Sequence, residues 1–292
     1  MKDVQKGSND VFLDGIGLVL EGGGMRGVYT AGVLESFLEN GLSFPYVIGV
    51  SAGACNAASY ISQQKGRNKR VNLEYISDSR YLSLKNYIKN RELFGMDFIF
   101  NEIPSRLIPF DFESFYQNQT EFVIGTTDCK TGDPLYFKKS DYGQEMLTVL
   151  KASSSLPFVS QEIFFKSRYL LDGGISDSIP LKKAKSDGYR KNVVVLTRNE
   201  GYTKKPSRFS FLVKKRYPQY PGLQRALTRR YQMYNDTINE IIQEEKKGNI
   251  IVIRPTNPIK VGRLERNTTR LEDLYQQGYE DGLASIEAIM HF

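Results

Sequence analysis

Histidine and cysteine are nearly absent from this chain of 292 residues, which contains one His and two Cys. Two cysteines, Cys55 and Cys129, imply no disulfide framework, so a reducing compartment fits the composition best. One histidine and two distant cysteines also cannot build a typical zinc site. We therefore expect no metal and no other cofactor, although a magnesium or calcium site made only of carboxylates stays open.

Long apolar runs are also absent. The N-terminal residues 1–6 are polar and lead into no apolar stretch. No segment approaches the ~20 apolar residues that a membrane-spanning helix needs, and no secretory signal is visible. We therefore expect a cytoplasmic protein whose membrane contact, if any, is peripheral and at the inner membrane face.

Acidic residues are missing from one stretch of the chain, residues 201–235. The same stretch is rich in cations, namely Lys204, Lys205, Arg208, Lys214, Lys215, Arg216, Arg225, Arg229 and Arg230. Tyr202, Phe209, Phe211, Tyr217 and Tyr220 are interleaved with them. Together with the net charge of +7, the pattern suggests that 202–230 contacts an anionic membrane surface. A solvated face with inward aromatics is an equal alternative, and we expect no nucleic acid because no recognised motif accompanies the charge.

Apolar runs and glycine-rich breaks alternate along the first sixty residues. Residues 15–21 and 46–50 read as buried strands, and 28–38 and 52–61 as the helices that follow them. Two strand–helix units predict an α/β protein with a parallel sheet and right-handed crossovers. Further strands are expected at 121–126, 135–138, 168–171, 192–197 and 249–253, and helices at 144–153, 181–186, 223–246 and 271–290. Residues 62–118 look less regular, and no linker or repeat divides the chain.

A serine between glycines is the main catalytic signal. The segment Gly49-Val50-Ser51-Ala52-Gly53 lies where a predicted strand meets a predicted helix. A nucleophile elbow has this geometry, because the turn is too tight for side chains at positions 49 and 53 and exposes the serine hydroxyl above the sheet. The helix N-terminus adds a field that favours negative charge. We predict that Ser51 is the nucleophile of a hydrolase, with Gly49 and Gly53 forming its elbow.

A second glycine-rich turn, Gly22-Gly23-Gly24-Met25-Arg26-Gly27, follows the first predicted strand. Its backbone N–H groups can turn inward at a helix N-terminus and bind an oxyanion. Parallel strands bring this turn beside Ser51 at the carboxyl edge of the sheet. The same turn fits a dinucleotide-binding fingerprint, but no acidic residue occurs from 42 to 65, where that fold needs one. Arg26 either assists an anionic group or braces its own loop.

The base that activates Ser51 has two candidates, His291 and Asp172. The order Ser51, Asp172, His291 matches the triad of α/β-hydrolases. However, His291 follows the closing helix with one residue left, where chains usually fray, so we interpret it as a surface residue. Asp172 precedes Gly173-Gly174 at the end of an apolar strand. Burial would have to raise its pKa toward the working pH, and the competing interpretation is an ordinary turn aspartate.

With these residues assembled, the chain resembles the patatin-like phospholipases, a family of lipid acyl hydrolases. Residues 22–27 resemble the oxyanion loop of the family, residues 49–53 its nucleophile elbow, and residues 172–174 its catalytic-aspartate motif. The family uses a Ser-Asp dyad without histidine, so the resemblance assigns Ser51 as nucleophile and Asp172 as base. The whole chain looks more specifically like a bacterial cytosolic branch of the family.

The resemblance also carries expectations about fold and substrate. It implies a three-layer α/β/α fold with a mainly parallel central sheet, over a catalytic region of about 15–198. We expect one domain over 1–292, with 199–292 as a C-terminal extension packed on that region. The implied substrates are phospholipids or other acyl esters, cleaved without calcium. Residues 152–157 resemble a family stretch that helps to line the site.

Two points stay open at the level of sequence. The apolar cluster 93–100 is either core packing or the lid of an acyl-chain entrance. The chain as a whole is either an active ester hydrolase or a catalytically dormant protein that binds lipid or membrane.

Overall fold

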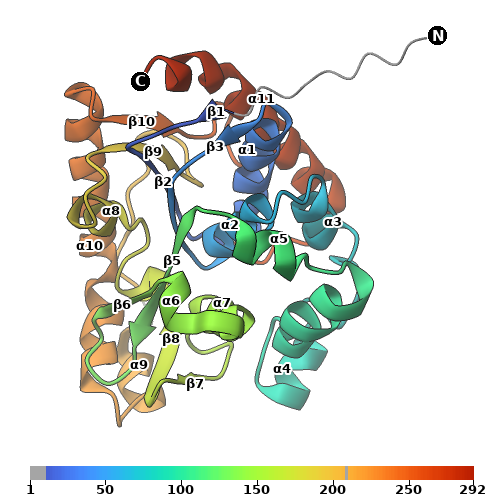
Figure 1. The fold of residues 1–292 in the computed structure, drawn as a ribbon. Helices are drawn as coiled ribbons and strands as arrows, with labels where there is room; N and C mark the ends of the chain where they lie inside the picture. The colour runs from blue at the N-terminus through green and yellow to red at the C-terminus, as the bar shows by residue number, and fades with distance from the viewer. Residues whose placement is uncertain (1–10, 208–209) are drawn as a thin grey trace.

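The fold is built around an eight-stranded mixed sheet, seen in a computed structural model that describes residues 11–207 and 210–292 (Figure 1). The strand order is β10-β9-β2-β4-β5-β8-β7, and β6 pairs with β5. The strands are β2 (Ile16–Leu20), β4 (Tyr46–Val50), β5 (Glu121–Asp128), β6 (Pro134–Phe137), β7 (Ile163–Phe165), β8 (Arg168–Asp172), β9 (Lys191–Val195) and β10 (Ile250–Ile253). The five strands from β10 to β5 are parallel, whereas β6, β8 and β7 pair antiparallel.

Helices cover both faces of this sheet. The helices are α1 (Val28–Glu39), α2 (Ala52–Ile61), α3 (Arg67–Leu73), α4 (Leu84–Asn90), α5 (Phe112–Gln117), α6 (Lys139–Tyr142), α7 (Met146–Ser153), α8 (Leu181–Ser186), α9 (Ser210–Arg216), α10 (Pro221–Lys246) and α11 (Thr268–Met290). Short 3₁₀ turns occupy Gly24–Gly27, Gly143–Glu145 and Gly173–Ile175, and a π-helix spans Phe98–Leu107. A separate two-stranded pair joins β1 (Val11–Phe12) to β3 (Leu42–Ser43).

The sheet has a hydrophobic core on each face, because successive side chains of a strand point to opposite faces. In β2, Leu18 and Leu20 belong to the core beneath α1, α2, α7 and α11. Val19, between them, belongs to the opposite core beneath α8 and α10. The expected three-layer α/β/α fold with a mainly parallel sheet is therefore confirmed.

The region that looked irregular, residues 62–118, contains α3, α4, the π-helix and α5. The sequence pattern does not reveal α3 and α4 because these two helices bury few side chains or none. In α3 only Asn68 and Leu73 are buried, and α4 buries none. A short helix without a buried face has no apolar periodicity to read.

Residues of the C-terminal third enter the same sheet and the same core. β10 pairs parallel with β9, and α11 packs against α1 at glycine contacts. A Cβ atom added to Gly278 would lie 2.0 Å from the Tyr29 carbonyl oxygen, and one added to Gly32 would lie 2.1 Å from that of Tyr275. The Tyr29 hydroxyl also donates to Asp281 at 2.9 Å. The two helices approach closely enough only because both glycines lack side chains.

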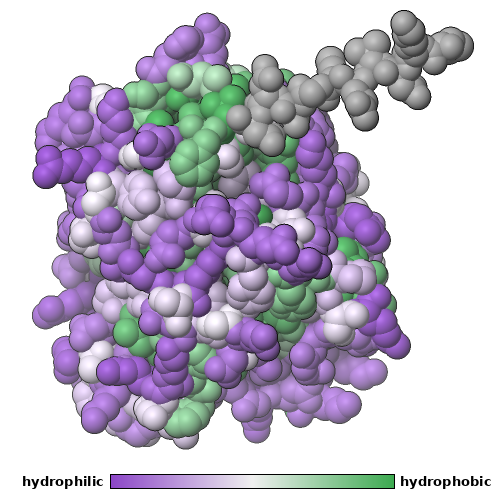
Figure 2. All heavy atoms as spheres, viewed as in Figure 1, coloured by the Kyte–Doolittle hydropathy of each residue, from purple (hydrophilic) through white to green (hydrophobic). Residues whose placement is uncertain are grey.

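The surface is mostly hydrophilic in the view of Figure 2, with apolar areas at the upper end, around β1 of Figure 1, at the right of the lower half, and at the lower end, near the β7–β8 hairpin. None of the helices in the described part of the chain combines the length and the apolar character that a membrane crossing requires.

Candidate active site

Ser51 occupies a strained turn between β4 and α2. Its φ of 55° and ψ of −126° fall where residues with a side chain are rarely found. The elbow glycines allow this turn by close approach: a Cβ at Gly49 would lie 2.7 Å from the Ala54 nitrogen, and one at Gly53 would lie 2.7 Å from the Leu20 oxygen. Strain of this kind persists only where the surroundings enforce it, which is common at active sites.

A neighbouring serine holds the elbow in place. Ser153, at the end of α7, accepts the backbone N–H of Ser51 at 2.8 Å and donates its own hydroxyl to the Gly125 carbonyl at 2.6 Å. Ser153 is fully buried. The strained backbone of the elbow is therefore tied to β5, the next strand of the sheet.

Strand register brings Asp172 to the same place. Val50 pairs with Gly125 in β5, and Asp172 pairs with Thr126, one residue further along the same strand. β5 extends three residues beyond Gly125, and β8 pairs antiparallel with those residues, so the last residue of β8 lies at the level where β4 ends. The Asp172 backbone is held there, since its N–H donates to the Ser155 carbonyl and its carbonyl accepts the Thr127 hydroxyl, both at 2.9 Å.

The Asp172 carboxyl group is buried, and only one of its two oxygens accepts a hydrogen bond from the described residues. Its side chain belongs to a residue that is 2% exposed, and Oδ1 accepts the Gly174 N–H at 2.7 Å. Oδ2 has no hydrogen-bond partner among the described residues. Burial raises the pKa of Asp172, while Arg230 and the nearby Ser51 hydroxyl lower it. Such a carboxylate is a stronger base than an exposed one and has a free oxygen for a proton.

The glycine-rich turn lies beside Ser51, as the sheet order predicts. The Gly22 N–H already donates to the Ser178 carbonyl at 3.2 Å. Gly23 and Gly24, at the start of the 3₁₀ turn, donate no hydrogen bond to any described residue. Gly24 has a φ of +58° and faces the Arg263 backbone, so its peptide needs a residue without Cβ. These two N–H groups are the available donors for an oxyanion.

The rest of the turn is fixed from behind. Gly27 packs so closely on Ala52 that a Cβ would lie 2.6 Å from the Ala52 Cβ, and its carbonyl accepts the Asn56 amide at 2.7 Å. Arg26 is 3% exposed, and its Nε has no partner among the described residues. Burial, followed by repulsion from Arg198, lowers the pKa of Arg26 to about 10. No hydrogen bond of the Arg26 side chain braces its own loop within the described residues.

His291 lies at the opposite edge of the sheet. It ends α11 and is exposed, and the next residue, Phe292, accepts a hydrogen bond from Lys191 at the first position of β9. Ser51 and Asp172 lie where β4 and β8 end. The structure therefore does not bring His291 together with the two other members of a triad.

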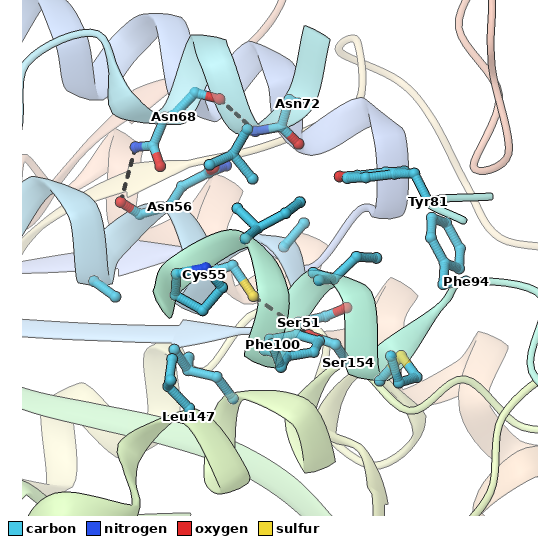
Figure 3. A pocket seen from close by; sticks show the side chains of 18 of the residues that line it. Ser51, Cys55, Asn56, Asn68, Asn72, Tyr81, Phe94, Phe100, Leu147 and Ser154 are labelled. Atoms are coloured by element: carbon cyan, nitrogen blue, oxygen red, sulfur yellow. Dashed lines mark hydrogen bonds between the residues drawn. The ribbon is translucent and has the colours of Figure 1, made fainter. Parts of the chain in front are cut away.

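An apolar cavity of about 130 Å³ opens beside Ser51 (Figure 3). Its wall comes from α2, α3, α7 and the segment before and within the π-helix, and includes Cys55, Val71, Tyr81, Phe94, Met96, Phe100 and Leu147. Asn56, Asn68 and Asn72 line one side and are linked by hydrogen bonds from Asn68 to the Asn56 carbonyl and from Asn72 to the Asn68 carbonyl. A mostly apolar cavity that ends at a serine hydroxyl suits an acyl chain.

Two segments singled out in the sequence meet at this cavity. Phe94, Met96, Ile99 and Phe100 from the cluster 93–100 form part of its wall, and Met96 and Phe100 are buried. The cluster is thus core and cavity wall together. From the stretch 152–157, Ser154 and Leu156 line the cavity, whereas Ser153 and Ser155 hold the backbones of Ser51 and Asp172.

Some residues at the site were not assigned to it by sequence reasoning. Arg230 and Arg263 lie close enough to Asp172 to lower its pKa. The same two arginines lower the pKa of Lys204, which therefore lies beside them. Lys204 and Arg263 follow β9 and β10, two strands of the parallel series. Their positions after those strands are the signal that could have found them. Among the described residues, no three His, Cys, Asp or Glu side chains gather as a metal site would require.

Two family models match this chain. The patatin-like phospholipase model matches residues 18–185, more than half of the sequence. The chain therefore belongs to the patatin-like phospholipase family. A second model, a domain of unknown function (DUF6363), matches residues 220–292, which contain α10, β10 and α11.

Several known proteins are similar to the chain. The uncharacterized protein YjjU of Escherichia coli is 32% identical over 189 residues, which cover 62% of this chain and 52% of YjjU. Lysophospholipase NTE1 of Lodderomyces elongisporus is 29% identical, with 60% of this chain and 12% of NTE1 covered. The probable lipid hydrolase 463L of Invertebrate iridescent virus 6 is 29% identical, with 60% and 65% covered. The chain thus matches about half the length of YjjU. Among solved structures, VipD from Legionella pneumophila matches with a TM-score of 0.47 and 13% identity, over 94% of this chain and 67% of VipD.

Proposed function

We propose that this protein is a serine hydrolase that cleaves acyl esters of lipids with a Ser51–Asp172 dyad. One observation carries the proposal: Ser51, in a strained turn at the mouth of an apolar cavity, lies close enough to lower the pKa of the buried Asp172, whose Oδ2 accepts no hydrogen bond from the described residues. Membership of the patatin-like phospholipase family supports it, as do the names of the similar lysophospholipase and lipid hydrolase.

The proposed reaction has two halves. Asp172 Oδ2 accepts the hydroxyl proton of Ser51 while Ser51 Oγ attacks the acyl carbonyl carbon. The N–H groups of Gly23 and Gly24 donate to the oxyanion that forms. Collapse breaks the ester C–O bond, and the leaving alcohol takes the proton from Asp172. A water molecule, deprotonated by Asp172, then attacks the acyl-enzyme, and Ser51 recovers its proton as the fatty acid leaves.

An organophosphonate probe tests the nucleophile. We expect a covalent adduct on Ser51, located by mass spectrometry and absent from the Ser51→Ala variant. Ester hydrolysis should fall about 10³-fold or more in both Ser51→Ala and Asp172→Asn. Ser154→Ala removes another serine hydroxyl of the same cavity and should change the rate only a few-fold. An unlabelled, folded wild-type protein would contradict the proposal.

The alternative function is a catalytically dormant protein that binds lipid or membrane. It predicts association with liposomes but no release of fatty acid from mixed phospholipids. Release of fatty acid by the wild-type protein, lost in Ser51→Ala, would exclude it. The free Asp172 oxygen beside Ser51 favours the active enzyme, because a dormant site has no need to keep a buried carboxylate unpaired.

We further propose a peripheral contact with an anionic membrane surface, through the end of the molecule that carries α4, α9 and the β7–β8 hairpin (Figure 1). These elements expose Leu84, Ile88, Phe164, Tyr169, Phe211 and Leu212. Cations flank these side chains in sequence, namely Lys85, Lys89, Lys166, Lys214, Lys215 and Arg216. Exposed apolar side chains beside cations suit the interface of an anionic bilayer.

The basic stretch 202–230 contributes to this contact only in part. Phe211 is 69% exposed, whereas Tyr217 is fully buried and its hydroxyl accepts the Phe158 N–H. Arg208 and Phe209 lie outside the described residues. Arg230 lies beside Asp172 in the candidate active site instead, and Lys204 lies beside Arg230. The cytoplasmic location and the lipid substrate stay predictions.

A further inference from the structure

Five cationic side chains lie within electrostatic reach of one another at one flank of the candidate active site. Arg26 follows β2, Arg198 and Lys204 follow β9, Arg263 follows β10, and Arg230 projects from α10. The first four thus come from the carboxyl ends of three neighbouring parallel strands. Arg230 joins them from α10, where its Nε donates to the Gly174 carbonyl at 2.5 Å. We call these five residues the cation cluster.

The cation cluster is not balanced by acids. No member forms an ion pair within 4.0 Å in the described part of the chain. The nearby carboxylates are Glu21 and Asp172. Glu21 is already occupied, since it accepts the Thr197 N–H at 2.6 Å and the Tyr234 hydroxyl at 3.1 Å. Burial lowers the pKa of Lys204, and repulsion from Arg230 and Arg263 lowers it further. Cations held together at this cost are characteristic of a site that binds an anion.

The cluster is built into the fold and is not a set of loose surface side chains. The Lys204 backbone is clamped to α10, since its N–H donates to Asn235 Oδ1 at 2.8 Å and its carbonyl accepts the Asn235 amide at 3.0 Å. The Lys204 ammonium lies 3.9 Å from the ring centre of Tyr234. The Arg263 carbonyl accepts the Met25 N–H at 3.1 Å, which ties this loop to the glycine-rich turn. Arg26 adds a buried Nε without a partner.

The cluster and the acyl cavity lie on different sides of the reacting groups. The cavity wall is formed by α2, α3, α7 and the π-helix and, among the described residues, includes none of the five cations. The cluster comes from the segments that follow β2, β9 and β10, which lie on the other side of β4 from β5 and β8 in the strand order, and from α10. A substrate with its carbonyl at Ser51 would place its acyl chain on one side and its polar end on the other.

We propose that the cation cluster binds the phosphate group of a phospholipid substrate, with Lys204, Arg230 and Arg263 as the residues that the C-terminal third supplies. Guanidinium and ammonium groups form strong charge-assisted hydrogen bonds to phosphate oxygens. The inference rests on the proposed function, which it deepens by naming the substrate class. A phosphate-bearing lipid would therefore be preferred over a neutral ester with the same acyl chain.

Binding is tested without turnover, in the Ser51→Ala protein. Calorimetric titrations with glycerol 3-phosphate, inorganic phosphate and glycerol separate a lipid headgroup from a free phosphate ion. We expect glycerol 3-phosphate to bind, and its Kd to rise about tenfold in Lys204→Gln and in Arg263→Gln. Lys205→Gln changes the exposed neighbouring lysine and is the matched control. Failure of glycerol 3-phosphate to bind at millimolar concentration would overturn the proposal.

Kinetics on a matched pair of substrates then tests whether the phosphate group that the cluster binds belongs to the lipid substrate. Monoacylglycerol and its 3-phosphate carry the same acyl ester and differ only in the phosphate group. The ratio of their kcat/KM values should fall about tenfold in Lys204→Gln and Arg263→Gln, mainly through KM of the phosphate-bearing lipid. The ratio should be unchanged in Lys205→Gln. If the cluster serves only to keep Asp172 ionised, both substrates will slow equally and the proposal fails.

The experiments distinguish a wrong phosphate site from a wrong assignment as a hydrolase. If the wild-type protein hydrolyses both esters and the kcat/KM ratio is the same in Lys204→Gln and Arg263→Gln, the proposed phosphate site is wrong and the proposed hydrolase stands. If inorganic phosphate binds but the ratio does not respond, the lipid headgroup is excluded as the ligand. An inactive protein that still binds glycerol 3-phosphate through Lys204 and Arg263 would retain the site and contradict the hydrolase.

Discussion

At the scale of single residues, the proposed Ser51–Asp172 dyad depends on the charge that surrounds Asp172. Burial raises the pKa of this carboxyl group, and Arg230 is the foremost influence that lowers it. Asp172 acts as a base only when ionised, so the rate should rise with pH through its pKa and then level off. The pH at which the rate rises therefore depends on how far Arg230 lowers the pKa of Asp172.

We therefore predict that Arg230→Gln moves the acid limb of the pH profile to higher pH. Loss of the cation removes an influence that lowers the pKa of Asp172, so more of the aspartate is protonated at a given acidic pH. The measurement is kcat/KM against pH with a neutral chromogenic ester, on which the phosphate site has no bearing. Arg229→Gln, on the exposed side of the same helix, should leave the profile in place. A shift to lower pH in Arg230→Gln would contradict this account.

Ser51 and Asp172 could both be predicted from the sequence, because the glycines around them mark turns with close backbone approach. Ser153 could not be assigned its role, since a serine in a helix carries no sign that its hydroxyl accepts the N–H of Ser51. Lys204 and Arg263 follow predicted strands, which marks them as candidates, but the sequence does not show which other residues lie beside them. Their position beside Arg26 depends on which strands are neighbours, and the sequence pattern leaves that order open.

At the scale of elements, the contact between α1 and α11 depends on glycine. We predict that Gly278→Ala destabilises the protein by about 2 kcal/mol, because the new methyl group would meet the Tyr29 carbonyl oxygen, a backbone atom that moves only with its helix. The higher helix propensity of alanine offsets part of the loss, by about 1 kcal/mol. Urea unfolding monitored by circular dichroism measures the change.

Gly262→Ala serves as the control for this prediction. A Cβ added there meets nothing within 4 Å, so the free energy of unfolding should change by no more than about 0.5 kcal/mol. Equal stability of the Gly278→Ala and wild-type proteins would show that the two helices can separate without cost.

Elements with a buried face were predictable, and those without one were not. The buried strands β2 and β4 and the helices α1 and α2 lie within a few residues of their expected bounds, because their apolar runs are continuous. α3 and α4 were missed because they pack few or no side chains. The antiparallel direction of β8 also left no trace in the sequence.

At the scale of the whole molecule, the exposed apolar side chains of α4 predict membrane association. Leu84 and Ile88 are 74% and 82% exposed and lie four residues apart on one face of the helix. The double variant Leu84→Ser/Ile88→Ser should bind vesicles with one-third anionic phospholipid at least about tenfold more weakly, since each apolar side chain that enters the interface contributes about 1.5–3 kcal/mol when fully buried. Flotation of the Ser51→Ala protein with vesicles measures this without lipid turnover.

Leu283→Ser, an exposed substitution on α11, is the matched control for the flotation experiment. It should leave binding unchanged, and raised salt should weaken binding of the wild-type protein because flanking lysines contribute. Equal binding by the α4 double variant would place the membrane contact elsewhere on the molecule.

The single domain expected over 1–292 stays a prediction, and the contacts of the C-terminal third support it. β10 extends the sheet beside β9, and α11 buries Leu271 and Leu274 in the core that α1 and α2 share. A C-terminal extension held in this way contributes to the core, and through Arg230 and Arg263 it also reaches the candidate active site.

The sequence by itself determined which groups are candidates for the chemistry of this protein: a serine in an elbow, an aspartate before two glycines, a glycine-rich turn, and too little histidine for a triad. These features are local, because each depends on a few adjacent residues and on backbone geometry that glycine alone permits. The tertiary structure decided what surrounds that chemistry. Strand order and register set the apolar cavity on one side of Ser51 and five cations on the other, and such placement follows from contacts between residues far apart in the chain.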